Sequence, residues 1–199
     1  MTEPADLRQA ILRKSRESQA TQEKFFSENA EGIALCARAM AAAFSDGARL
    51  FVMGNGGSHC DAEHVTVEFM HPIFEKRPAL PAQTLAAETA LLTAVANDQD
   101  FSLAFSQQLK LLGRKGDIAL GISTSGKSSG VARALKSARE LGLLTVGFTG
   151  RDGGQLPAAC DHCFIVPSFS IHRIQETHGT LLHVLWDLVH VIRGEEDVL

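Results

Sequence analysis

Short apolar segments alternate with amphipathic segments along most of the chain. Five runs have the length and composition of strands, at residues 49–53, 82–86, 117–122, 143–149 and 162–166. Segments with helical spacing follow them and end near residues 70, 96, 112, 141 and 193. Short apolar strands that alternate with helices are typical of parallel sheets covered on both faces. The pattern therefore predicts an α/β fold in which ligands bind beyond the carboxyl ends of the strands.

The first 46 residues carry two helical patterns of different character. Residues 6–29 are polar and weakly amphipathic, with too few apolar side chains for burial inside one chain, so we expect this helix to pack against a partner. Residues 30–45 are more apolar, and Asp46-Gly47 closes them in the manner of a glycine C-cap. No linker or repeat interrupts the sequence. We therefore predict one domain over residues 1–199, with N-terminal helices at 1–46 and a parallel α/β core at 47–193.

The charge balance excludes several classes of function. The 199 residues include 19 Lys and Arg against 23 Asp and Glu, a formal charge of −4, which leaves no basic footprint for duplex DNA or anionic lipid. The polar N-terminus lacks the apolar stretch of a signal peptide, and no uncharged apolar run approaches the ~18 residues of a membrane span. We expect a cytoplasmic protein that binds neither nucleic acid nor membrane.

The four cysteines include a Cys-x-x-Cys pair, Cys160 and Cys163. A structural zinc site would need two more soft ligands at a matching spacing, and Cys36 and Cys60 stand far apart without such partners. A thioredoxin-type motif would lie between a strand and the helix that it opens. We therefore expect free thiols in a reducing compartment.

Loops rich in glycine and hydroxyl groups follow three of the predicted strands. Residues 54–58, Gly-Asn-Gly-Gly-Ser, offer backbone N–H groups at a helix start, although a tight turn also explains these glycines. Residues 123–128, Ser-Thr-Ser-Gly-Lys-Ser, place four hydroxyls before a helix, which favours phosphate binding over an ordinary N-cap. Residues 121–128 also match the Walker A pattern. We reject nucleotide hydrolysis, because the strand would have to end before Gly121 and no second strand ends in an Asp suited to magnesium.

Two predicted helices carry candidates for acid–base chemistry and metal binding. His64 and Glu68 are four residues apart, so both point from one helix face and together could grip a metal, while Glu68 could also act as a general base. The last helix carries Gln175, His178 and His183 among apolar residues. Spacing alone does not decide whether His178 or His183 is functional. His190 is expected to be a core residue.

Five segments taken together resemble the phosphoheptose isomerase family of the sugar isomerase (SIS) fold: residues 54–64, 96–98, 121–128, 149–154 and 173–178. The resemblance implies a flavodoxin-like SIS domain, a five-stranded parallel sheet with helices on both faces, and a homotetramer whose N-terminal helices pack between subunits. It further implies conversion of D-sedoheptulose 7-phosphate to D-glycero-D-manno-heptose 7-phosphate through an enediol, for bacterial lipopolysaccharide or capsule heptose synthesis.

The family's functional residues transfer to matching positions of this chain. Its zinc ligands, one ion per subunit, fall on His64, Glu68, Gln175 and His183, with Glu68 as the base and His183 as the acid. The implied substrate contacts are Asn55, Gly56, Gly57, Glu68, Asn97, Asp98, Ser123, Thr124, Ser125, Ser128 and Gln175. Lys127 and His172 depart from some family members, and neither replaces a residue of the predicted acid–base set.

Two alternatives from other functional classes remain at this point. A similar tetrameric SIS protein binds the bacterial replication initiator and lacks the acid–base set, and other SIS proteins sense sugar phosphates as regulators. The presence of His64, Glu68, Gln175 and His183 favours catalysis over the first alternative. The chain shows no attached DNA-binding segment that would favour the second.

Overall fold

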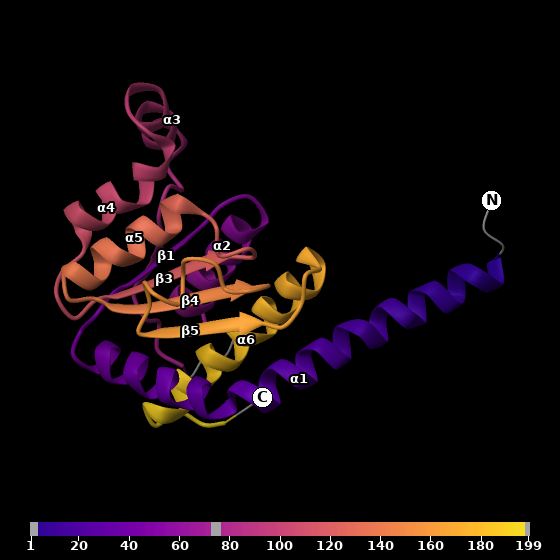
Figure 1. Ribbon diagram of the computed structural model, residues 1–199. Helices are drawn as coiled ribbons and strands as arrows, with labels where there is room; N and C mark the ends of the chain where they lie inside the picture. The colour runs from indigo at the N-terminus through magenta and orange to yellow at the C-terminus, as the bar shows by residue number, and fades with distance from the viewer. Residues whose placement is uncertain (1–3, 73–76, 198–199) are drawn as a thin grey trace.

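Five parallel strands form the sheet at the centre of the molecule (Figure 1). The computed structural model describes residues 4–72 and 77–197. The strands are β1 (Leu50–Gly54), β2 (Ala82–Thr84), β3 (Ile118–Ser123), β4 (Leu144–Gly150) and β5 (His162–Val166). Their order is β2-β1-β3-β4-β5, and every neighbouring pair is parallel. This is the flavodoxin-like order, so the predicted α/β fold is confirmed.

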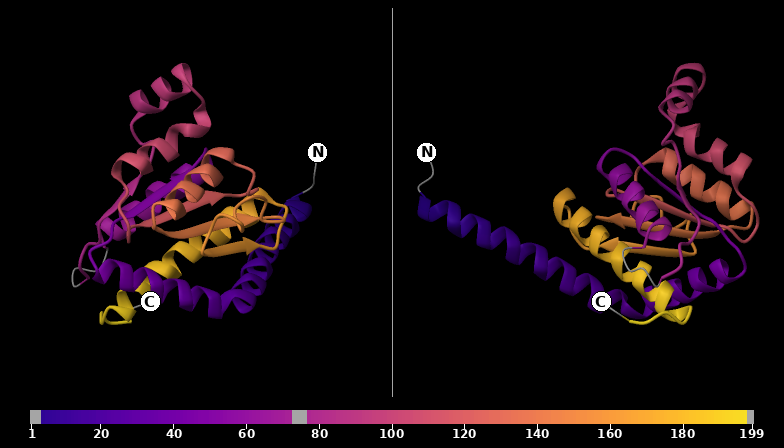
Figure 2. Two further views of the ribbon diagram at one scale, coloured as in Figure 1. Left: turned by 60° about the vertical axis from the view of Figure 1, so that its left-hand side comes forward. Right: turned by 180° about the vertical axis from the view of Figure 1, so that it is seen from behind.

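Helices cover both faces of the sheet. They are α1 (Pro4–Ser45), α2 (Gly57–Met70), α3 (Thr89–Asp98), the 3-10 helix η1 (Phe101–Leu103), α4 (Ala104–Leu112), α5 (Ser129–Glu140) and α6 (Ile171–Ile192). Alternate strand residues face opposite sides. Leu120 and Phe148 belong to the core beneath α1, α2 and α6, whereas Ala119 and Phe51 belong to the core beneath α4 and α5. Figure 2 shows these two helical layers from the side and from behind.

The predicted pair of N-terminal helices is wrong, because α1 is continuous from Pro4 to Ser45. No proline interrupts the helix after Pro4, and one interior glycine, Gly32, costs only about 1 kcal/mol relative to alanine. The C-terminal part of α1 packs on the sheet, while its N-terminal part forms an arm (Figures 1 and 2). On that arm Leu7, Ile11 and Leu12 are 54%, 67% and 45% exposed. The expected lack of burial in residues 6–29 is confirmed up to residue 20, whereas Phe25 is fully buried in the core.

Strand β3 extends through Ser123, which places Gly121 inside the strand. A β-carbon at Gly121 would stand 2.7 Å from side-chain atoms of Leu135 and Val131, so this glycine lets α5 approach the sheet. A Walker A loop would need the chain to leave the strand at Gly121. The geometry agrees with the rejection of that motif.

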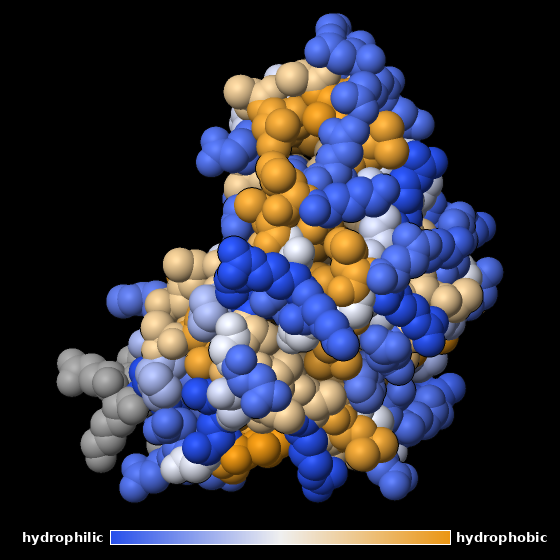
Figure 3. Space-filling model, turned by 90° about the vertical axis from the view of Figure 1, so that its left-hand side faces the viewer, coloured by the Kyte–Doolittle hydropathy of each residue, from blue (hydrophilic) through white to orange (hydrophobic). Residues whose placement is uncertain are grey.

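Helix α3 projects from the body of the molecule and packs mainly against η1 and α4 (Figure 1). On the face seen in Figure 3, apolar side chains gather in the upper part, where α3 and α4 lie. The exposed apolar side chains of this region include Leu91, Phe101 and Leu111. Among the described helices, none combines the length with the hydropathy that a bilayer span requires.

Candidate active site

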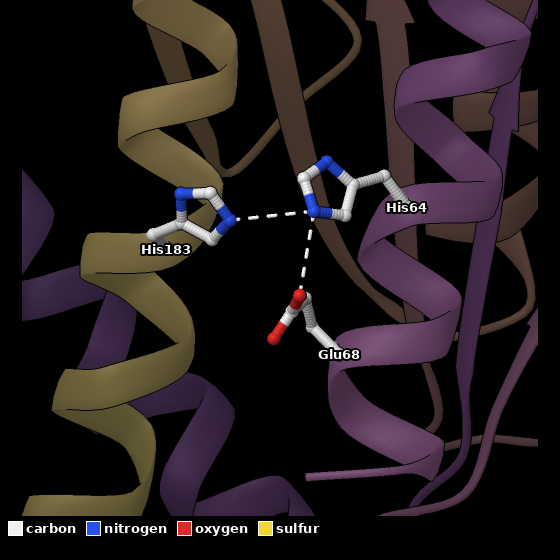
Figure 4. Close-up of side chains that lie close together, drawn as sticks. All are labelled: His64, Glu68 and His183. Carbon is white, nitrogen blue, oxygen red and sulfur yellow. Dashed lines mark hydrogen bonds and ion pairs between the residues drawn. The ribbon is translucent and has the colours of Figure 1, made fainter. Parts of the chain in front are cut away.

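His64, Glu68 and His183 meet between α2 and α6 (Figure 4). The Nε2 atom of His64 lies 3.3 Å from Oε1 of Glu68 and 3.3 Å from Nε2 of His183. His64 and Glu68 share a face of α2 because they are one turn apart, and α6 brings His183 from a position 119 residues later in the chain. The three side chains form one group. Within the pair on α2, Glu68 is the more buried, with 22% of its side chain exposed against 43% for His64.

The donor atoms of this group suit a divalent metal ion. One oxygen and two imidazole nitrogens all lie within 4.8 Å of one another. Zinc binds such ligands at about 2.0–2.2 Å, and a tetrahedral arrangement then separates neighbouring ligand atoms by roughly 3.3–3.5 Å. The two distances of 3.3 Å agree with that separation. The group therefore has the chemistry and the spacing to hold a metal.

Gln175, on α6, contacts the start of α2. A β-carbon at Gly57 would collide with its side-chain amide, so the glycine leaves room for Gln175. Gln175 also forms a hydrogen bond with Asp61, and the charge of Asp61 interacts with His64. The contacts described for Gln175 do not include His64, Glu68 or His183, so its role as a fourth ligand stays a prediction.

Asp61, which is not among the residues predicted from the sequence, interacts with both His64 and Gln175. Partial burial raises the pKa of its carboxyl group, while His64 and the hydrogen bond from Gln175 oppose that rise. The sequence signal was present, since Asp61 precedes His64 by three residues and helical residues three apart are neighbours. Asp61 therefore links two of the proposed metal ligands from different helices.

The structure decides between the two candidate histidines of α6. His178 is fully buried against Phe148, and its Nε2 atom lies 3.1 Å from the carbonyl oxygen of Thr149, to which it donates a hydrogen bond. Burial lowers the pKa of His178 to about 4, so the ring is neutral. His183 is exposed and belongs to the group with His64. His183 is thus the functional candidate, and His178 fixes α6 to the end of β4.

The serine-rich loop after β3 has the form of an anion site. Helix α5 begins at Ser129, directly after the N-cap residue Ser128, so the first N–H groups of the helix are free to bind an anion. The side-chain amide of Asn55 donates to Oγ of Ser128 at 2.8 Å, which joins the loops after β1 and β3. The other hydroxyl groups of this loop belong to Ser123, Thr124 and Ser125, and Ser123 is buried at the end of the strand. Lys127 is exposed.

The glycine loop after β1 borders a cavity of about 220 Å³. Gly56 is the N-cap of α2 with φ 58°, a backbone conformation that favours glycine. The lining of the cavity includes Asn55, Gly56 and Phe101, so this space extends from the loop toward η1. Backbone groups and the Asn55 amide are therefore available there to a polar ligand.

Asn97 and Asp98 lie at the end of α3, exposed to solvent. The Asn97 amide donates to the Asp98 carboxylate at 2.7 Å. Within one chain, the described contacts do not join these two residues to the His64, Glu68 and His183 group. Their place in a substrate site stays a prediction.

Comparison with known proteins relates this geometry to a family. A model described as the SIS domain matches residues 15–150. The phosphoheptose isomerase of Desulfovibrio desulfuricans is 46% identical over 178 residues, which are 89% of this chain and 85% of that protein. The enzyme of Thermodesulfovibrio yellowstonii is 42% identical, over 96% of this chain and 94% of its own. The chain belongs to the phosphoheptose isomerase family.

A solved phosphoheptose isomerase has the same architecture. The structure from Neisseria gonorrhoeae superimposes with a TM-score of 0.85 at 34% identity, and the match covers 92% of this chain and 98% of that one. The family resemblance seen in the motifs is confirmed, and this chain is a sugar-phosphate isomerase. A non-catalytic or purely regulatory SIS protein is thereby excluded as the identity of the chain.

Proposed function

We propose that this isomerase converts D-sedoheptulose 7-phosphate to D-glycero-D-manno-heptose 7-phosphate through an enediol. The observation that carries the proposal is that the donor atoms of Glu68, His64 and His183 lie within 4.8 Å of one another. Two of these residues lie on α2, the helix that begins at the glycine loop after β1. The names of the relatives support a seven-carbon sugar phosphate. This reaction would begin the synthesis of heptose for the bacterial lipopolysaccharide or capsule.

The spacing along α2 suits a substrate with a phosphate at one end. His64 lies seven residues after Gly57, a rise of about 10 Å along the helix. In this proposal Ser123, Thr124, Ser125 and Ser128 hold the phosphate near the helix start. The sugar chain then extends toward Glu68, and its hydroxyl groups bind Asn55, Gly56, Gly57, Asn97, Asp98 and Gln175.

An aldose–ketose isomerisation moves one proton between adjacent carbons and others between oxygens. Glu68 removes the carbon-bound proton and returns it to the neighbouring carbon, since a carboxylate can both accept and donate it. His183 donates a proton to the carbonyl oxygen and accepts one from the adjacent hydroxyl group. Glu68 and His183 both lie 3.3 Å from Nε2 of His64, so the two side chains are close enough to act on adjacent atoms of one substrate.

We also propose one zinc ion per subunit, held by His64, Glu68, Gln175 and His183. A bound zinc ion would polarise the oxygens of the substrate at the reacting carbons. The donor set and the two separations of 3.3 Å support this assignment. Asp61 holds the amide of Gln175 in this arrangement, because its carboxylate accepts the hydrogen bond of that amide.

We further propose that four chains assemble into a homotetramer. The arm of α1 exposes Leu7, Ile11 and Leu12, and the projecting α3 region exposes Leu91 and Phe101. Apolar side chains gathered on two projecting elements are typical of surfaces that another subunit covers. Light scattering is expected to give about four times the 21.4 kDa of the chain. An Ile11→Glu variant should shift that mass downward, and a monomeric wild type would contradict the assembly.

The decisive experiment is direct turnover of sedoheptulose 7-phosphate by the wild type and by Glu68→Gln. Loss of the general base is expected to lower kcat by about 10²–10⁴-fold. Glu63→Gln is the matched control, because Glu63 lies on the same helix, is exposed and pairs with His59 at 3.7 Å instead. The control should keep the wild-type kcat.

Three outcomes separate the parts of the proposal. Wild-type turnover by Glu68→Gln would refute the role of Glu68 as the base. Turnover of a different sugar phosphate, with none of sedoheptulose 7-phosphate, would refute the substrate and leave the acid–base assignment intact. Full activity of a metal-free protein would refute the role of zinc, which metal analysis of the wild type and of His64→Ala measures directly.

A further inference from the structure

Two of the four cysteines lie together beneath the sheet. Cys163 is in β5, directly beside Gly147 of β4, and Cys160 lies just before the strand. The point where a β-carbon of Gly147 would stand is 2.6 Å from Sγ of Cys160 and 3.3 Å from Sγ of Cys163. Both sulfur atoms therefore occupy the space that a side chain at residue 147 would fill.

The two thiols have unequal surroundings. Cys160 is buried, whereas Cys163 is partly exposed. The thiol of Cys160 forms a hydrogen bond with the sulfur of Cys163, which lowers the pKa of Cys163 and raises that of Cys160. Cys163 is thus the better nucleophile of the two and the more accessible one, because the thiolate is the reactive form.

The remaining cysteines provide a contrast within the same chain. Cys36 is buried alone in the other core, and burial raises the pKa of its thiol to about 12. Cys60 is exposed on α2. Neither is described in contact with another sulfur, so both serve as internal references for the chemistry of the pair.

Within the described part of the chain, no group of three or more Cys, His, Asp or Glu ligand atoms within 4.8 Å of one another includes either sulfur. Asp161, between the two cysteines, is engaged elsewhere: its Oδ2 accepts hydrogen bonds from the backbone N–H and the hydroxyl of Thr145, at 2.9 and 2.7 Å. Its Oδ1 lies 3.6 Å from Nε of Arg139. These contacts fix the loop that carries Cys160 against β4. The chemistry left to the two sulfurs is that of a dithiol.

We propose that Cys160 and Cys163 form a redox-active dithiol that hydrogen peroxide oxidises to a disulfide within the chain. The thiolate of Cys163 attacks one peroxide oxygen, the O–O bond breaks, and hydroxide leaves with the proton that Cys163 released, as water. The sulfur of Cys160 then attacks the sulfenic sulfur, and the S–O bond breaks. The thiol proton of Cys160 leaves with that oxygen as a second water. The two sulfurs lose two electrons, and the peroxide gains them.

The segment before Cys160 connects the pair to the serine-rich loop. The N–H of Gln155 donates to the carbonyl oxygen of Gly126 at 2.8 Å, and a β-carbon at Gly126 would collide with the backbone of Gly153. Leu156 packs in the same core as Cys160, with Cδ2 3.6 Å from the β-carbon position of Gly147. Bond formation between the sulfurs moves Cys160 and therefore acts on the contact between Gln155 and Gly126. This connection holds whether or not the loop binds phosphate.

The experiment treats the folded wild type with hydrogen peroxide and counts free thiols before and after. Two of the four thiols should disappear, the intact mass should fall by two hydrogen atoms, and a peptide carrying both Cys160 and Cys163 should contain the bond. Dithiothreitol should restore all four thiols. Because this measurement uses the wild type, it does not depend on the folding of any variant.

Matched variants identify the roles of the two sulfurs. Cys36→Ser with Cys60→Ser should oxidise like the wild type. Cys160→Ser should leave a sulfenic acid on Cys163 that a dimedone reagent traps, and Cys163→Ser should form no bond. Retention of four thiols by the treated wild type, or a bond between two chains, would overturn the proposal.

Hydrogen exchange tests the connection to the loop. The amide of Gln155 should exchange at least tenfold faster in the oxidised protein than in the reduced one, and Cys163→Ser treated with peroxide should show no change. Equal exchange in the two wild-type forms would refute the connection while leaving the disulfide itself established.

Discussion

Replacement of His178 by glutamine should flatten the dependence of stability on pH. His178 is fully buried, and it donates a hydrogen bond to the carbonyl oxygen of Thr149. Its pKa of about 4 in the folded chain lies below the 6.5 of an unperturbed histidine, because burial disfavours the charged ring. Glutamine keeps a donor for Thr149 and removes the titration.

The size of the effect follows from these two pKa values. The unfolded chain binds a proton at His178 as the pH falls through 6.5, while the folded chain does not until about pH 4. Stability is therefore fully present above pH 6.5 and is lost between these values as the pH falls. The loss from this residue is about 2 kcal/mol between pH 7.5 and pH 5, and it reaches about 3.4 kcal/mol below pH 4.

Urea unfolding measures the free energy of unfolding at pH 7.5, 6.5, 5.5 and 5 for the wild type and His178→Gln. All samples have the same protomer concentration, since assembly changes the apparent stability. The difference between the two proteins should shrink by about 2 kcal/mol from pH 7.5 to pH 5. His190→Gln is the matched comparison, because burial also lowers the pKa of His190 to about 4.

Equal losses of the free energy of unfolding by wild type and His178→Gln between pH 7.5 and pH 5 would refute the role of His178 in the pH dependence. If the wild type loses more free energy of unfolding than His190→Gln but not more than His178→Gln, the pH dependence arises at His190 instead. His190 packs against Trp186, with ring centroids 5.1 Å apart. Parallel curves for all three proteins would mean that each ring has the same pKa in the folded and the unfolded chain.

Three further predictions concern the proposed site. Gly57→Ala should displace the amide of Gln175 and weaken zinc binding about 10–100-fold in a competition assay, whereas unchanged affinity would separate Gln175 from the metal. Asn55→Ala removes a hydrogen bond to Ser128 and should weaken inorganic phosphate binding roughly 2- to 12-fold by calorimetry. Dialysis against a chelator should lower both activity and Tm in the wild type but leave the Tm of His64→Ala unchanged; an unaffected wild type would count against the metal.

Much of the fold was predictable because each buried strand is short and apolar. The final strand was predicted at residues 162–166, and the structure has it there. The strand predicted at 82–86 ends at Thr84, because Ala86 has φ 61° and its N–H donates to the side chain of Gln108. That hydrogen bond is a tertiary contact, which local sequence does not reveal.

The acid–base group was predictable only in part. The relation of His64 to Glu68 is local, since it depends on helical spacing alone. The choice between His178 and His183 depends on how α6 rotates against the end of β4, which is set by packing against Phe148 and the bond to Thr149.

The break predicted inside α1 was wrong for a related reason. The helix continues where it packs on α6 and β5, and no local signal ends it.

The arrangement of the group across α2 and α6 also sets the order in which the protein acquires activity during synthesis. The ribosome adds the pair on α2 more than 100 residues before His183, and it completes the serine-rich loop after β3 more than 50 residues before His183. Nascent chains that lack α6 therefore have neither the proposed acid nor the full set of metal ligands, and they expose the core face that α6 covers. In a chain of this design, the acid–base group and the proposed metal site are completed in one late step, when the last long helix docks.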